Sequence, residues 1–182
     1  MAIGKHDCKI AHDTDFKQAI AIGLDEALIA LEESFYDLSD EEIQSFPVAG
    51  QNNIAWIVMH SLDNLDDCAN GCPSGQRTFP AEWRWNLWGC RPEERPKPGD
   101  RFPPKEEMLA LLRGVREAAM ATLDTTEEPV LTERSIPHPR KKSRADFYMR
   151  TIYHTMSHVR QIWLLRGALG LADGPWPEQH WA

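Results

Sequence analysis

Two histidines spaced four residues apart, His154 and His158, are the residues of this sequence best suited to chemistry. The surrounding stretch, from about residue 144 to 169, has the pattern of a long helix. In a helix, residues i and i+4 lie on one face, about one 5.4 Å turn apart. Two imidazole rings placed in this way can bind the same metal ion. A third histidine, His60, lies in another apolar stretch of helical pattern. Three histidines from two helices would leave at least one coordination position open, which suits catalysis or ligand binding better than a structural role.

An ordinary packing role is the alternative for these three histidines, because a single histidine in a helix is more often a core or surface residue than a ligand. Two buried imidazoles, however, need partners for their ring nitrogens, since unpaired buried polar groups are costly. A shared metal ion would satisfy one nitrogen on each ring. The other histidines lie in terminal or proline-flanked segments and are expected to be surface residues: His6, His12, His138 and His180.

Other side chains near these positions could take part. Asp63 lies one helical turn after His60 and could orient a ring or accept a proton, as carboxylates behind metal ligands do; a solvated helix acid is the alternative. Cys68 and Cys72 are four residues apart and could supply two thiolates, although cysteine is commonly a small apolar residue. The sequence has no G-x-G-x-x-G or phosphate-binding loop, so no nucleotide cofactor is expected.

Composition restricts the class of protein. A chain of 182 residues can bury a sizeable core, and its net charge of −8 argues against a general affinity for nucleic acid phosphates. A local basic run at 140–144 is expected to be a solvated approach to a helix. The N-terminus is polar without a signal-peptide core, and no apolar run approaches the roughly 20 residues that span a bilayer. We therefore expect one cytoplasmic domain over 1–182, with neither nucleic acid nor membrane as partner.

Four long helices must position the histidines. Apolar residues spaced three and four apart predict the first helix, which Asp13 or Thr14 would cap. A capping box at Ser39 predicts a short segment after it, and Asn53 would cap the second long helix. Acidic residues follow Lys105 in the first turn of the third helix, as the helix dipole favours. The four are expected at about 14–31, 53–70, 105–123 and 144–169.

A long irregular connection, about 72–104, separates the second and third helices. It is rich in proline and contains Trp83, Trp85 and Trp88, which predict that it packs onto the helices. Connections of this length within a domain are often functional. A long crossover also allows two consecutive helices to run parallel. The fold expected is therefore all-α, and the long crossover is compatible with a four-helix bundle of up-down-down-up order, although the periodicity alone does not fix that order.

The two histidine-bearing segments together resemble the DinB-like superfamily of bacterial four-helix-bundle metalloproteins. One histidine on the second helix and a pair on the fourth follow the family's order, and the outline of the match covers roughly 14–170. Only two segments are specific: NIAWIVMH at 53–60, followed by Asp63 and Asp67, and HTMSHVRQI at 154–162, followed by Leu165, Arg166 and Gly167.

The resemblance implies a divalent metal, zinc or nickel, held by His60, His154 and His158 in an up-down-down-up bundle, and a homodimer. Characterised relatives include transferases and isomerases that use low-molecular-weight thiols such as bacillithiol or mycothiol. The resemblance therefore implies that this chain is a metal-dependent thiol S-transferase, or a hydrolase, in which the metal binds the thiol at its open coordination position. A metal ion lowers the pKa of a bound thiol or water and so makes a nucleophile at neutral pH.

One departure from the family concerns the residues after the histidine pair. Many members have a glycine between the second histidine and the glutamine, whereas Val159 and Arg160 precede Gln161 here. The bulkier residues there and the long Trp-rich crossover bear on the shape of the pocket, and so on the substrate, rather than on the binding of the metal. Arg160 and Gln161 are further candidates for a role beside the site, and the Trp83–Trp88 segment is a candidate lid that excludes water.

Two other functions remain open. The first alternative to the enzyme is a non-enzymatic, metal-dependent protein that binds a small ligand, for example in a stress response. The second is a protein in which the metal only joins two helices. A structural zinc site normally has four protein ligands. The sequence offers no convincing fourth, although Cys68, Asp63 or His180 could approach from elsewhere.

Overall fold

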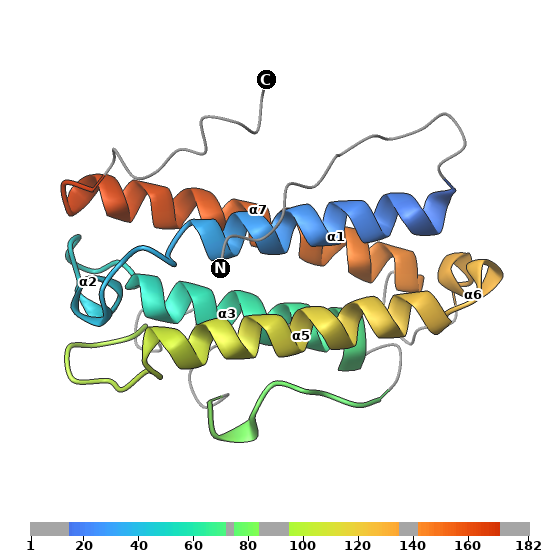
Figure 1. The fold of residues 1–182 in the computed structure, drawn as a ribbon, viewed down its shortest axis with the longest axis horizontal. Coiled ribbons are helices and arrows are strands. Elements are labelled where there is room, and N and C mark those ends of the chain that lie inside the picture. The colour runs from blue at the N-terminus through green and yellow to red at the C-terminus, as the bar shows by residue number, and fades with distance from the viewer. Residues whose placement is uncertain (1–14, 72–74, 84–94, 135–141, 172–182) are drawn as a thin grey trace.

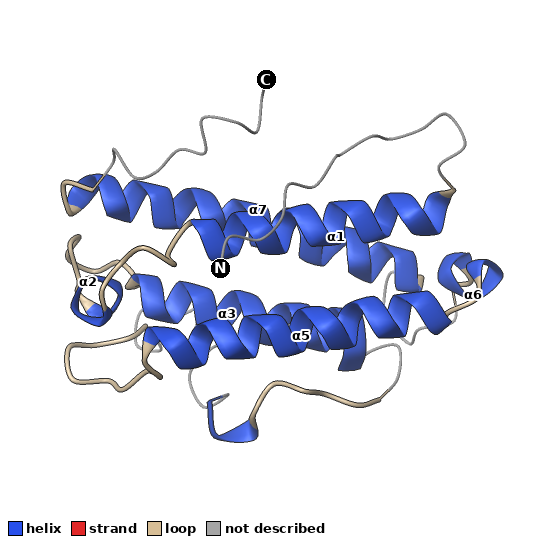
Figure 2. Ribbon diagram, viewed as in Figure 1, coloured by secondary structure: helices blue, strands red, loops and turns tan. Residues whose placement is uncertain are grey.

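Every helix or strand that the computed structural model describes is a helix. The model describes residues 15–71, 75–83, 95–134 and 142–171, and no strand occurs among them (Figure 2). The predicted all-α class is therefore confirmed.

Four long helices make up most of the molecule, at the positions that the apolar spacing predicts. They are α1 (Phe16–Glu33), α3 (Ile54–Asp66), α5 (Lys105–Thr125) and α7 (Arg144–Ala168). Shorter elements lie between them: α2 (Asp40–Gln44), the π-helix η1 (Asp67–Gly71), the 3-10 helix η2 (Ala81–Trp83) and α6 (Glu128–Thr132). The second long helix thus extends to Gly71 only by widening into a π-helical turn.

Polar side chains fix where the helices begin. Asn53 accepts a hydrogen bond from the backbone of Trp56, and the predicted capping box at Ser39 is present. Ser143 forms a second capping box at the start of α7. The cap of α1 is Asp15, which accepts from the backbone N–H of Gln18 at 2.7 Å. The prediction of Asp13 or Thr14 for this cap was therefore wrong, because Asp15 is the residue whose carboxylate reaches the third helical N–H.

The long helices contact one another in a regular order, with α1 and α7 side by side and α3 and α5 side by side (Figure 1). The contacts between α1 and α5 pair rising residue numbers in α1 with falling residue numbers in α5: Lys17 with Asp124, Asp25 with Arg116 and Glu32 with Arg113. Between α1 and α7 both numbers rise: a side chain at Gly23 would lie 3.3 Å from Ile152, and Arg166 donates to the Ser34 carbonyl at 3.3 Å.

The hydrophobic core lies between these four helices and receives fully buried residues from each, among them Leu24, Leu28, Leu62, Leu112 and Ile162. Burying an aliphatic side chain of this size contributes about 1.5–3 kcal/mol to folding. None of the helices in the described ranges combines the length and the apolar character needed to cross a bilayer.

Asp66, fully buried at the end of α3, holds the start of the crossover. Its carboxylate accepts from the backbone N–H groups of Thr78 and Phe79 at 3.0–3.1 Å and from the Thr78 hydroxyl at 2.5 Å. Asn70 Nδ2 and Arg77 Nε also donate to it, at 2.9 and 3.1 Å. Burial by itself raises the pKa of this carboxyl, but the hydrogen bonds from Thr78, Asn70 and the backbone outweigh burial and lower the pKa below its ordinary value.

Arg77 covers the acidic end of α3. Its guanidinium lies 2.5 Å from Asp63 Oδ1, 3.1 Å from Asp66 Oδ2 and 3.5 Å from Asp67 Oδ1. Gly71 makes room for the arginine stem, because a Cβ atom there would lie 3.1 Å from Arg77 Cγ. One arginine therefore contacts three carboxylates and attaches the crossover to the helix that carries His60.

The crossover packs onto the helices, as predicted, in the part that the structure describes. Phe79 and Phe102 are buried in the core, and Trp83 is half-buried against it. Trp83 Nε1 donates to Glu107 Oε1 in the first turn of α5 at 3.2 Å. The other two tryptophans of the predicted lid, Trp85 and Trp88, lie outside the described residues.

Candidate metal centre

His60, His154 and His158 lie together between α3 and α7. His60 is the central residue of α3, and the other two are one turn apart in the middle of α7. All three are partly buried. Tyr148, near the start of α7, donates to the carbonyl of Ala69, just beyond the end of α3, at 3.2 Å. The two helices therefore run in opposite directions, and His60 lies beside His154. Within the described ranges, this is the group of side chains whose arrangement could hold a metal ion.

The three rings direct nitrogen atoms towards a common point. His154 Nε2 lies 3.3 Å from His60 Nε2 and 3.3 Å from His158 Nε2. The ring planes are tilted or edge-on to each other, at 55° to 85°, with centroids 4.5–5.1 Å apart. One ligand atom from each histidine lies within 4.8 Å of the others. The rings therefore converge through nitrogen edges and do not stack.

These separations match a divalent ion bound by nitrogen. Metal–nitrogen bonds of about 2.0–2.1 Å at tetrahedral angles place two ligand nitrogens about 3.3–3.4 Å apart. Hydrogen bonding alone fits less well, because one imidazole nitrogen either donates once or accepts once. His154 Nε2 faces two nitrogens at equal distance and can satisfy only one of them in that way. The donor set thus fits a metal ion.

Two neighbours fix the orientation of the rings. Gln161 Oε1 accepts a hydrogen bond from His158 Nδ1–H at 2.8 Å, which leaves the lone pair of Nε2 directed at the site. Trp56, one turn before His60, stacks on that ring with centroids 4.7 Å apart and planes at 9°. Gln161 was a sequence candidate. The role of Trp56 was missed, although its spacing of four residues from His60 allows such stacking.

Electrostatics keep the pair on α7 in the form that binds metal. Burial, followed by the neighbouring His158, His60 and Arg150, lowers the pKa of His154 to about 3. Burial also lowers the pKa of His158, and the hydrogen bond to Gln161 opposes this only in part. Both rings are therefore neutral near pH 7, and their nitrogen lone pairs are available without loss of a proton.

The other residues that the sequence suggested for the site are not part of the three-histidine group. Asp63 is buried, and its carboxylate contacts Arg77; its proposed role towards a histidine ring stays a prediction. Cys68 is buried in η1 with Sγ 3.9 Å from Asn64 Oδ1, and it is not part of the three-histidine group. Cys72, His6, His12, His138 and His180 lie outside the described residues. Arg160 is exposed on α7.

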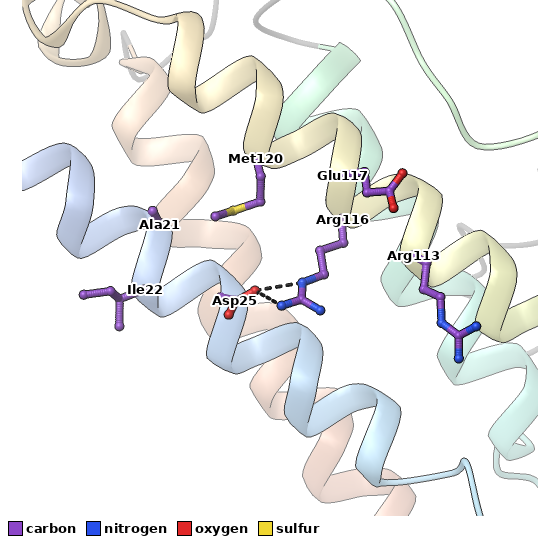
Figure 3. Close-up of a pocket in the computed structure, with 7 residues that line it drawn as sticks. All are labelled: Ala21, Ile22, Asp25, Arg113, Arg116, Glu117 and Met120. Carbon is purple, nitrogen blue, oxygen red and sulfur yellow. Dashed lines mark hydrogen bonds and ion pairs between the residues drawn. The ribbon is translucent and has the colours of Figure 1, made fainter. Parts of the chain in front are cut away.

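A separate hollow of about 460 Å³ lies between α1 and α5 (Figure 3). Ala21, Ile22 and Met120 form its apolar part, and Arg116 reaches across it to Asp25. Arg113, at one end, points away from that pair and approaches Glu32. Asp25, Arg113 and Arg116 are thus paired within the protein, whereas Glu117 is exposed, and none of the three histidines lines the hollow.

Comparison with known proteins agrees with the geometry. No curated protein gives a match to the chain. The family model of the DinB superfamily matches residues 24–162, which include α3, all three histidines and most of α7. The match covers more than half of the sequence, so the chain belongs to the DinB superfamily.

Proposed function

We propose that His60, His154 and His158 bind one divalent ion, zinc or nickel, and that the protein is a metal-dependent transferase using a low-molecular-weight thiol. The observation that carries the proposal is the pair of 3.3 Å separations between imidazole nitrogens. A bound ion would lower the pKa of a thiol in its open position and stabilise the thiolate. A small-molecule thiol is thus the expected partner, in a cytoplasmic protein.

The residues of the chain would hold the geometry of this site. Gln161 fixes the tautomer of His158, and Trp56 restricts rotation of His60. Exposed Ser157 and Gln161 lie on the histidine side of α7, where a small ligand could enter. Preorganised ligands of this kind avoid rearrangement when the ion or substrate binds.

The proposal includes an up-down-down-up bundle and a homodimer. The bundle order is supported by contacts that run in opposite directions between α1 and α5 and between α3 and α7, but in the same direction between α1 and α7. In Figure 1 the colour gradients of α1 and α7 run in one direction across the view, and those of α3 and α5 run in the other. The homodimer is supported by family membership alone.

Cobalt reconstitution tests the proposed function, because the visible spectrum of cobalt reports its coordination. A small neutral thiol, 2-mercaptoethanol, is expected to change this spectrum at millimolar concentration, since three histidines leave a position open to exogenous ligands. His158→Ala should abolish the response. Thiol-conjugation assays with electrophilic acceptors then test turnover.

A cobalt spectrum unaffected by thiols would remove the basis for thiol transfer. The alternative, a non-enzymatic protein that binds a different small ligand at the metal, would then be favoured. Spectral change without conjugation of any acceptor would also favour that alternative.

A further inference from the structure

Arg150 lies one turn before His154 on α7, on the side of the helix that carries the metal site. Its position, four residues before His154, places the two side chains as neighbours on one helix face. It is half-buried, and among the described residues it makes no hydrogen bond or ion pair. Arginine side chains are mostly exposed, and those that are buried are usually paired with an acid. A half-buried guanidinium without a carboxylate partner is therefore uncommon.

The acids at the facing end of α3 and at the start of α7 already have partners. Asp63, Asp66 and Asp67, on the end of α3 that faces the first half of α7, all contact Arg77. On α7 itself Asp146 accepts from Ser143 in the capping box. From Phe147 to the end of α7 the helix contains no other acid, although the whole chain has a net charge of −8.

We propose that Arg150 binds the carboxylate of a small anionic ligand whose other end occupies the open position of the three-histidine site. The proposal rests on the proposed metal site and names the chemical class of its substrate, a carboxylate-bearing thiol. A guanidinium offers two parallel N–H donors that match a carboxylate, and such charged hydrogen bonds are stronger than neutral ones. The metal ion and Arg150 together provide positive charge at a site in an otherwise acidic protein.

Binding of matched ligands to the cobalt-reconstituted protein tests this proposal. The pair is 3-mercaptopropionate and its neutral amide, 3-mercaptopropionamide, titrated by the visible spectrum. The wild type is expected to bind the carboxylate about tenfold more tightly, as a charged hydrogen bond allows. Arg150→Gln should remove this preference while leaving the affinity for the amide within about twofold, and Arg150→Lys should retain part of it.

Arg160→Gln is the matched control, because Arg160 is an exposed arginine of the same helix. It should keep the preference. Loss of the preference in Arg160→Gln as well would indicate a general charge effect and overturn the proposal. A preference that survives in Arg150→Gln would indicate chelation by the metal and would equally overturn it.

A second ligand pair separates this proposal from the thiol chemistry. Imidazole-4-acetate and its amide bind cobalt through nitrogen and carry the same difference in charge. A preference for the acetate that depends on Arg150 supports the role of Arg150 even when neither thiol binds, in which case only the thiol-transfer function fails. Absence of the preference in both pairs overturns the role of Arg150.

Discussion

Replacing His154 by alanine is expected to abolish stoichiometric metal binding. His154 Nε2 is the nitrogen that lies 3.3 Å from both of the others, so its loss leaves two imidazoles without the ligand between them. Loss of groups that only support metal ligands typically weakens affinity by about 10–100-fold, and loss of a ligand should exceed that range. Elemental analysis after reconstitution and gel filtration should find about one ion per wild-type chain and almost none in the variant.

His60→Ala should give the same result, whereas His138→Ala should retain the ion, because the sequence does not assign His138 to the ligand set. Far-UV circular dichroism should remain helical in all three variants and after chelation, because the apolar faces of the four helices pack without the metal. Equal metal content in the three variants would refute the assignment of the ligands. A spectrum that collapses to coil on chelation would instead favour a structural metal.

Replacing Asp66 by alanine is expected to produce the largest loss of stability. The substitution removes a fully buried carboxylate and leaves the backbone N–H groups of Thr78 and Phe79, together with Arg77, without that acceptor. Breaking a buried charged network in this way costs about 3–5 kcal/mol. Urea denaturation followed by circular dichroism measures the difference in free energy of unfolding.

Asp67→Ala is the matched control one residue along the chain. Its side chain is 37% exposed and makes a single 3.5 Å contact with Arg77, so its loss should cost no more than about 1 kcal/mol. Similar destabilisation by both substitutions would show that net charge matters at this helix end, and that the hydrogen bonds of Asp66 do not.

Local patterns in the sequence were sufficient to predict the four long helices and the caps at Ser39 and Asn53, but not the cap of α1, which is Asp15. Apolar residues spaced three and four apart located α1, α3, α5 and α7, and the polar residues Ser39 and Asn53 begin the helices they were expected to begin. The same periodicity put His154 and His158 on one face. The meeting of His60 with this pair required the order of helices that the family resemblance supplied.

Contacts between distant segments were not predictable in the same way. No local pattern links Arg77 to the acids of α3, since the pairing depends on where a proline-rich crossover returns. The stacking of Trp56 on His60 and the lack of a partner for Arg150 within the described part also depend on side-chain packing. The π-helical turn at Asp67–Gly71 departs from the period on which helix prediction rests.

X-ray absorption spectroscopy of the zinc-reconstituted protein tests the central claim most directly, because it reports the ligands of the ion. Three histidine ligands and an open position predict nitrogen and oxygen neighbours at about 2.0–2.1 Å, with the multiple scattering of imidazole and no sulfur. Addition of 2-mercaptoethanol should then introduce one sulfur neighbour at about 2.3 Å. A sulfur neighbour already present without added thiol would place a cysteine in a closed, four-ligand site and contradict the open three-histidine centre.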